Sequence, residues 1–213
     1  MAMQLILARH GNTFGPGDKV VWVGARSDMP LVEKGLQQAE AVAAGLKAAG
    51  LIPSRIYAGP LKRTAETAAI VARECGLPSE SIVIADELRE IDYGTWEARS
   101  NDEIRGEVGG GPIDGWQKLS IWPEGFGWKP GESDVTAAWN RLIEAIRRDN
   151  ADDAVLLIVS SNGIYRLVAK MLGLPSAEAK MGTGTVSRLV VDGSSVQIAG
   201  WNLDPSKLAE GPA

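Results

Sequence analysis

The sequence predicts an α/β protein with three layers, in which helices cover both faces of a mostly parallel central sheet. Short apolar runs alternate with longer amphipathic segments along the chain, which is the order expected of β–α units. The chain has 213 residues and an apolar content of 45%, enough to bury one core of this kind. We therefore predict a single domain over residues 1–204, followed by a C-terminal tail over residues 205–213.

The first half of the chain contains three predicted strands, at residues 4–8, 55–58 and 82–84. Between them lie two predicted helices, at residues 33–49 and 61–75. In the first helix, Leu36, Ala39, Ala43 and Leu46 recur at intervals of three or four residues, which places them on one face. Gly50 and Gly76 follow the two helices, and a glycine is the residue that most often ends a helix.

The second half returns to the same alternation. We predict helices at residues 133–148 and 162–172 on either side of a strand at residues 154–160. Residues 186–191 and 196–201 are then expected to pair as strands around the turn Asp192-Gly193-Ser194, with the last strand antiparallel at an edge of the sheet.

Residues 99–131 show no periodicity, and we predict an irregular, lid-like insertion there. The segment is rich in glycine and proline, and it holds Trp116, Trp122, Phe126 and Trp128. Two interpretations stay open: the aromatic side chains pack on one another, or they cover a binding pocket. The loop over residues 14–22 is a second candidate wall of that pocket.

Composition excludes several classes of function. A net charge of −5 argues against a nucleic-acid partner, which needs a basic surface. One histidine and one cysteine, Cys75, are too few for a His/Cys metal site, and a single cysteine forms no internal disulfide. No apolar run approaches the length of a membrane span, and no signal peptide is evident. We expect a cytoplasmic protein with no cofactor.

The single histidine, His10, lies directly after the first strand, between Arg9 and Gly11. In parallel sheets, ligands bind at the carboxyl ends of strands, and the residues 160–163 that follow another strand lead into a helix N-terminus, which favours anions. An arginine matches phosphate oxygens, and a neutral imidazole can attack phosphorus. The tripeptide alone leaves an ordinary structural histidine as the alternative.

Further motifs extend along most of the chain. The segment Arg9-His10-Gly11-Asn12-Thr13 resembles the opening motif of the histidine phosphatase superfamily, which includes cofactor-dependent phosphoglycerate mutases. Similar pieces of that family's pattern follow in order: Gly24, Asp28-Met29-Pro30-Leu31, Gly35 and Gln38-Ala39; Gly59-Pro60-Leu61-Lys62-Arg63-Thr64 with Thr67-Ala68; Glu90-Ile91-Asp92-Tyr93-Gly94-Thr95-Trp96-Glu97; Pro130-Gly131-Glu132-Ser133; and Trp201-Asn202. The resemblance implies a phosphoglycerate mutase-like fold.

The resemblance also implies a role for particular residues. His10 would be the nucleophile, and Arg9 and Arg63 would hold the phosphate oxygens. Glu90 would be the general acid and base, with Glu87 and Glu97 as competing candidates. Two further residues, Asn12 and Thr13, would contact the phosphate.

One departure from the family pattern concerns its second histidine. The matching stretch here is Val159-Ser160-Ser161-Asn162-Gly163, so that Ser161 stands where the family has histidine. A serine donates one hydrogen bond and carries no positive charge. We expect slower catalysis, with Ser161, Asn162 and the backbone of Gly163 contributing to substrate binding.

Three functions remain open from the sequence. The first is a phosphatase acting on a small phosphorylated metabolite through a phosphohistidine. The second is a mutase-like phosphoryl transfer, and the third is binding of a phosphorylated ligand without turnover. Formation of a homodimer is left open.

Overall fold

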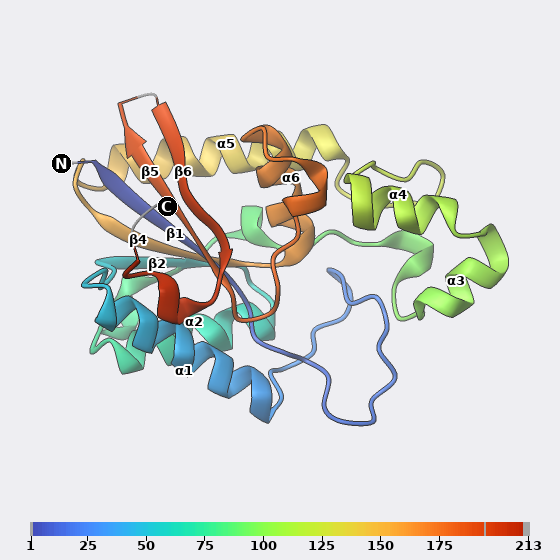
Figure 1. The fold of residues 1–213 in the computed structure, drawn as a ribbon, viewed down its shortest axis with the longest axis horizontal. Helices are drawn as coiled ribbons and strands as arrows, with labels where there is room; N and C mark the ends of the chain where they lie inside the picture. Colours follow the sequence, from blue (N-terminus) through green and yellow to red (C-terminus); the bar gives the residue numbers. More distant parts are fainter. Residues whose placement is uncertain (1, 194, 211–213) are drawn as a thin grey trace.

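The computed structural model describes residues 2–193 and 195–210, which form a six-stranded sheet with helices on both faces (Figure 1). The strand order across the sheet is β3-β2-β4-β1-β5-β6. The strands are β1 (Met3–Arg9), β2 (Arg55–Ala58), β3 (Ile82–Ile84), β4 (Val155–Ser160), β5 (Val186–Asp192) and β6 (Ser195–Leu203). The α/β class predicted from the sequence is confirmed.

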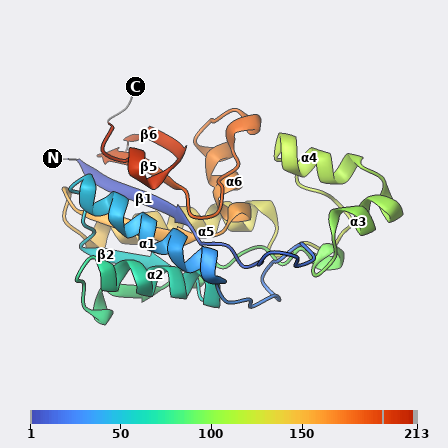
Figure 2. The same cartoon turned by 60° about the horizontal axis from the view of Figure 1, so that its bottom comes forward.

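The six α-helices divide into two covering layers and a separate pair. Their bounds are α1 (Glu33–Ala48), α2 (Lys62–Glu74), α3 (Asn101–Val108), α4 (Gly111–Leu119), α5 (Glu132–Asp149) and α6 (Asn162–Met171). Helices α1 and α2 lie on one face of the sheet and α5 and α6 on the other, whereas α3 and α4 extend away from the sheet in both views (Figures 1 and 2). None of the helices in residues 2–193 and 195–210 has the length and apolar character needed to cross a membrane.

Alternating side chains of the central strands build the two halves of the core. Leu5 and Leu7 of β1 face the cluster that contains the α5 and α6 side chains, whereas Ile6 and Ala8 face the cluster that contains those of α1 and α2. All four are at most 1% exposed. A strand covered on both faces has an uninterrupted apolar sequence, which explains the run at the start of the chain.

The sheet is parallel through its first four strands and changes direction at β5. Strand β4 pairs in parallel with both β1 and β2, and β3 pairs in parallel with β2. Strand β5 is antiparallel to β1, and β6 returns antiparallel to β5 at the edge, as expected for the last strand. The predicted turn between them includes Ser194, which lies outside the described residues.

Residues 99–131 differ from the irregular insertion that the sequence predicts, because they contain α3 and α4. Ser100 caps α3 by accepting a hydrogen bond from the backbone N–H of Glu103, whose carboxylate in turn accepts one from the backbone of Ser100. The two helices have eight and nine residues. Helices of about two turns, interrupted by glycines, show too few repeats for a period of 3.6 to be recognised.

The predicted C-terminal tail also needs correction, since its first residues belong to the domain. Residues Pro205–Lys207 form a 3₁₀ turn, and Leu208 is 2% exposed within the core cluster that contains α1 and α2. An isolated leucine among polar residues gives no periodic signal, so the sequence did not show this contact. Residues 211–213 lie outside the described residues.

Two glycines allow the loop after β1 to cross the first turn of α1. A Cβ atom on Gly35 would lie 2.2 Å from the backbone oxygen of Asn12, and one on Gly11 would lie 2.2 Å from the backbone oxygen of Gly35. No side chain fits between these two backbones, so the crossing fixes the residues on either side of Gly11.

We predict that Gly35→Ala destabilises the protein by about 2 kcal/mol or more, because the methyl group forces two backbones apart. Gly106→Ala is the matched control, since Gly106 is also helical but its Cβ position is open space. That variant should be neutral or stabilise by up to about 1 kcal/mol. Chemical denaturation compares the two, and equal effects would contradict the importance of the crossing.

Candidate active site

A cavity of about 750 Å³ lies at the carboxyl end of β1. Its lining comes from most parts of the fold: Arg9, His10, Asn12, Thr13, Phe14, Gly15, Val20, Val21, Trp22, Val23, Arg63, Glu90, Tyr93, Asn101, Trp116, Gln117, Asn162, Arg166, Lys180 and Thr183. Seven of the nine residues that the sequence predicts for the site are among them. The missing two are Ser161 and Gly163.

His10 is fixed by two backbone contacts where β1 ends. Its backbone N–H donates to the carbonyl of Ser160 in β4 (3.1 Å), and its ring Nδ1 lies 2.7 Å from the carbonyl of Gly11. Because a carbonyl only accepts, Nδ1 carries the proton and Nε2 keeps a free lone pair. Burial, and then the charges of Arg9 and Arg63, hold the pKa of His10 well below its usual value. The ring is therefore a neutral base with a free Nε2.

The two arginines beside His10 are held by backbone carbonyls. Arg9 donates through Nη1 to the carbonyl of Met181 (2.6 Å), while its buried Nε has no partner in the described residues. Arg63 is 1% exposed and donates to the carbonyls of Ser27 (2.7 Å) and Gly24 (3.2 Å). Burial lowers the pKa of both guanidinium groups, but the value of a free arginine is high enough for both to stay charged.

Glu90 is the only carboxylate among the described residues that line the cavity. It is 4% exposed, and its oxygens accept hydrogen bonds from the backbone N–H of Ile91 (3.0 Å) and Gly163 (3.2 Å). Burial raises the pKa of Glu90, against the opposing effect of the Arg63 charge. A raised pKa favours the protonated form that a general acid needs.

The two competing glutamates have other positions. Glu87 is exposed and does not line the cavity. Glu97 accepts hydrogen bonds from the backbone N–H groups of Gly24 and Arg26, both at 3.0 Å, and so shapes the loop whose carbonyls hold Arg63. The geometry therefore favours Glu90 as the acid and gives Glu97 a positioning contact.

Asn12 and Thr13 both line the cavity. The backbone N–H of Asn12 donates to Oε1 of Gln38 (2.8 Å), and its side-chain oxygen accepts from the hydroxyl of Thr183. Because that oxygen is engaged, the Asn12 side chain offers a ligand its N–H donors, which suit an anion. Thr13 is 7% exposed and adds a hydroxyl to the same wall.

Ser161 is not at the cavity surface, in contrast to the expectation that it contacts the substrate. It is 0% exposed, and its hydroxyl has no partner in the described residues. Its neighbour Asn162, which has a longer side chain, does line the cavity. The backbone N–H of Gly163 donates to Glu90 and so orients its carboxyl group.

Several lining residues are not among those predicted from the sequence. Tyr93 lies beside Glu90. Burial raises the pKa of Tyr93, and the charge of Glu90 raises it further. Arg166 and Lys180 add two positive side chains, and Thr183 holds Asn12. Arg166 was detectable in principle, because it follows Asn162 by four residues and therefore shares its helix face.

Both interpretations of the aromatic segment hold for different residues. Trp128 packs within an aromatic cluster, with its ring centroid 4.7 Å from Tyr93 and 5.1 Å from Trp96. Trp116 lines the cavity, as does Trp22 from the loop that the sequence predicted as a second wall. The lining of the pocket thus includes two tryptophan side chains, and Trp116 lies against the guanidinium of Arg166.

The comparisons with known proteins agree with this geometry. Residues 5–204 match the sequence profile of the histidine phosphatase superfamily (branch 1). The chain belongs to this superfamily. A histidine phosphatase relative, the probable phosphoglycerate mutase GpmB of Cronobacter sakazakii, is 30% identical over 205 residues, which cover 93% of this chain and 90% of that protein.

Solved structures share the histidine phosphatase fold of this chain. YhfR of Bacillus stearothermophilus superposes with a TM-score of 0.76 at 28% identity, covering 94% of this chain and 97% of that one. A mycobacterial glucosyl-3-phosphoglycerate phosphatase gives a TM-score of 0.77 at 23% identity, with 94% and 99% covered. The latter likeness concerns the fold alone.

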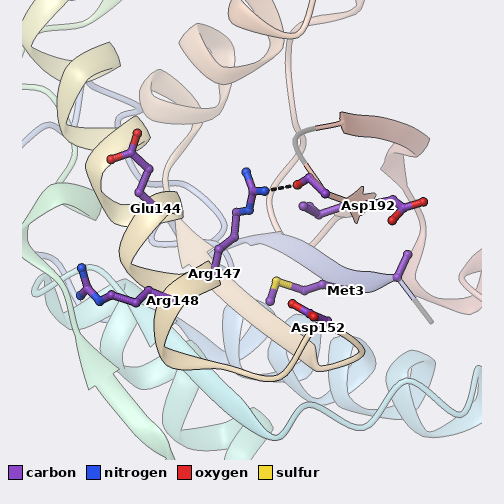
Figure 3. A pocket seen from close by; sticks show the side chains of 9 residues that line it. Met3, Glu144, Arg147, Arg148, Asp152 and Asp192 are labelled. Carbon is purple, nitrogen blue, oxygen red and sulfur yellow. Dashed lines mark hydrogen bonds between the residues drawn. The ribbon is translucent and has the colours of Figure 1, made fainter.

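A second cavity, of about 660 Å³, lies at the opposite end of β1 (Figure 3). Its charged lining residues are Glu144, Arg147, Arg148, Asp152 and Asp192, and Arg147 donates to the carbonyl of Gly193. Its acidic and basic side chains are mixed, and it lacks the concentration of positive charge that a phosphate needs. Within the described residues, no cluster of His, Cys, Asp and Glu could hold a metal ion.

We predict that Glu90→Gln lowers kcat/KM for an alkyl phosphate by about 100-fold or more, because an alkoxide leaving group needs a proton. For an aryl phosphate, whose phenolate leaves without a proton, kcat/KM should fall far less. In the unsubstituted protein the alkyl phosphate rate should fall as pH rises through the pKa of Glu90, above its ordinary value of 4.5, because the acid loses its proton.

The exposed Glu87→Gln variant is the control and should keep both rates and the pH profile. The assignment of Glu90 is wrong if Glu90→Gln lowers kcat/KM equally for both substrates. It is also wrong if the rate of this variant with the alkyl phosphate still falls at high pH.

Proposed function

We propose that the protein is a phosphatase that hydrolyses a small phosphate ester through a phosphohistidine on His10. The observation that carries the proposal is the state of the His10 ring, which is neutral, fixed through Nδ1 and presented to a cavity lined by the half-buried Arg9 and the buried Arg63. A nucleophile, a clamp for the phosphate oxygens and a buried acid thus meet in one pocket.

In the first step, Nε2 of His10 attacks the phosphorus atom and forms an N–P bond while the ester P–O bond breaks. Glu90 gives its proton to the departing oxygen, so the product leaves as an alcohol. Arg9 and Arg63 stabilise the charge on the phosphoryl oxygens during transfer. The Nδ1 proton stays on the ring, where the carbonyl of Gly11 stabilises the positive charge that the imidazole gains.

In the second step, water attacks the phosphorus atom and the N–P bond breaks. The Glu90 carboxylate takes a proton from the water, and the electron pair of the N–P bond returns to Nε2. Inorganic phosphate is released, and both His10 and Glu90 return to their starting states.

A mutase-like phosphoryl transfer is the second candidate, because the relatives at 30% identity are named probable phosphoglycerate mutases. Such an enzyme returns the phosphoryl group to another hydroxyl instead of to water. Its phosphohistidine must therefore survive until the acceptor is in place. The open cavity of about 750 Å³ gives water access and favours the phosphatase.

Binding without turnover is the third candidate, and it rests on Ser161. The buried serine supplies no charge to the phosphate, whereas a charged donor in an active site contributes about 100- to 1000-fold in rate. The two arginines and the neutral His10 remain, so we favour slow catalysis over its absence.

Rapid quenching of the protein with an alkyl or aryl phosphate tests the mechanism. We predict an acid-labile, base-stable phosphoryl group on the peptide that contains His10, formed before inorganic phosphate appears. His10→Ala should remove the group and lower turnover by at least about 1000-fold. The Gly106→Ala variant, on the outer helix α3, should keep both the phosphoryl group on His10 and the turnover.

Each other outcome identifies a different function. Phosphorylation of His10 without phosphate release, followed by transfer to an added hydroxyl compound, would favour the mutase. Tight binding of the phosphate ester with no phosphorylated peptide would favour the binding protein. Unchanged turnover in His10→Ala would overturn the phosphohistidine mechanism.

A further inference from the structure

We infer that the substrate carries a second anionic group beside its phosphate, and that Arg166 of α6 binds it. This inference rests on the proposed function in one respect: it takes the phosphate to lie between His10, Arg9 and Arg63. The cavity then has a second region, formed by Arg166, Lys180 and Trp116, that the phosphate chemistry does not use.

The charge of the cavity exceeds what one phosphate needs. Arg9, Arg63, Arg166 and Lys180 line it, against the single carboxylate of Glu90. His10 is neutral, and Glu90 is neutral whenever it carries the proton for the leaving group. A phosphate ester brings about two negative charges, which leaves about two positive charges unbalanced. A second phosphate would balance both of them, and a carboxylate would balance one.

Arg166 is built into the protein interior without an anionic partner. It is 2% exposed, and its buried Nε has no hydrogen-bond partner in the described residues. Neither Arg166 nor Lys180 takes part in any ion pair of residues 2–193 and 195–210. A buried, unpaired charge is costly, and such a group persists where a ligand pairs with it.

The outer helix α4 fixes the position of the Arg166 guanidinium. Its Nη1 donates to the hydroxyl of Ser120 (3.2 Å), directly after α4, and its central carbon lies 5.7 Å from the centroid of the Trp116 ring. These contacts hold one edge of the guanidinium and leave other N–H groups for a ligand. Residues 99–131 thus fix the position of the charged Arg166 side chain, which belongs to α6.

Arg166 is held by a different part of the fold from His10. His10 follows β1 and is fixed by backbone carbonyls, whereas Arg166 lies on α6 and contacts Ser120 and Trp116. A group bound by Arg166 would therefore lie beside the part of the cavity wall that Trp116 forms. This position fits a second anionic group on the substrate.

Calorimetric titration with two matched compounds tests the inference. The probes are 3-phosphoglycerate and glycerol 3-phosphate, which share a three-carbon skeleton and a phosphate and differ in a carboxylate. The unsubstituted protein should bind 3-phosphoglycerate about 10-fold more tightly or better, as expected for one charge-assisted contact. Arg166→Met, which keeps most of the side-chain volume, should reduce this preference to about one, and Arg166→Lys should keep part of it.

Lys170→Met is the matched control, because Lys170 lies one turn further along α6, at the surface, in an ion pair with Glu132. It should keep the full preference. Melting curves of each variant show whether Arg166→Met is folded, and Arg166→Lys provides the second variant if it is not.

The possible results separate this inference from the proposed function. Equal affinities for the two probes, or a preference that survives in Arg166→Met, would overturn the second anion site even if aryl phosphates are hydrolysed. A preference that depends on Arg166, in a protein that forms no phosphohistidine, would support the site and contradict the phosphatase mechanism.

Discussion

The contact between Nδ1 of His10 and the carbonyl of Gly11 is the interaction on which the site depends. It places the ring proton on one nitrogen and leaves the other free, while burial beside Arg9 and Arg63 keeps the ring neutral. The contact is possible because the loop after β1 crosses the first turn of α1 at two glycines. The position of His10 is therefore set by backbone atoms, and a side chain added at either glycine would disturb it.

Backbone groups of the surrounding loops fix the positions of the charged side chains. Glu97 holds the backbone of residues 24–26, the carbonyls there hold Arg63, and the backbone N–H of Gly163 holds Glu90. The outer helix α4 extends the same principle to Arg166 through Ser120 and Trp116. The pocket is a concentration of positive charge with one protonatable carboxylate, and this environment favours phosphate esters over other small ligands.

Much of this could be predicted from the sequence, because the central elements carry strong local signals. The apolar run of β1 and the periodic residues of α1 indicate their structures, and the family motifs bring seven lining residues together. Helices α3 and α4 were missed because they are short. Ser161 was misjudged for another reason: whether a side chain at the start of α6 reaches the cavity depends on its length and packing, which do not follow from spacing along the chain. Arg166 was not predicted, although its spacing from Asn162 places both residues on one face of α6.

The protonation state of His10 is the central claim, and the chain contains only one histidine, so its imidazole signals in a ¹⁵N NMR titration are unambiguous. We predict that the pKa of His10 lies well below the ordinary value of 6.5, and that the neutral ring carries its proton on Nδ1. A pKa at or above that value, or a proton on Nε2 of the neutral ring, would contradict the account, because Nε2 would then carry a proton and have no lone pair with which to attack a phosphate.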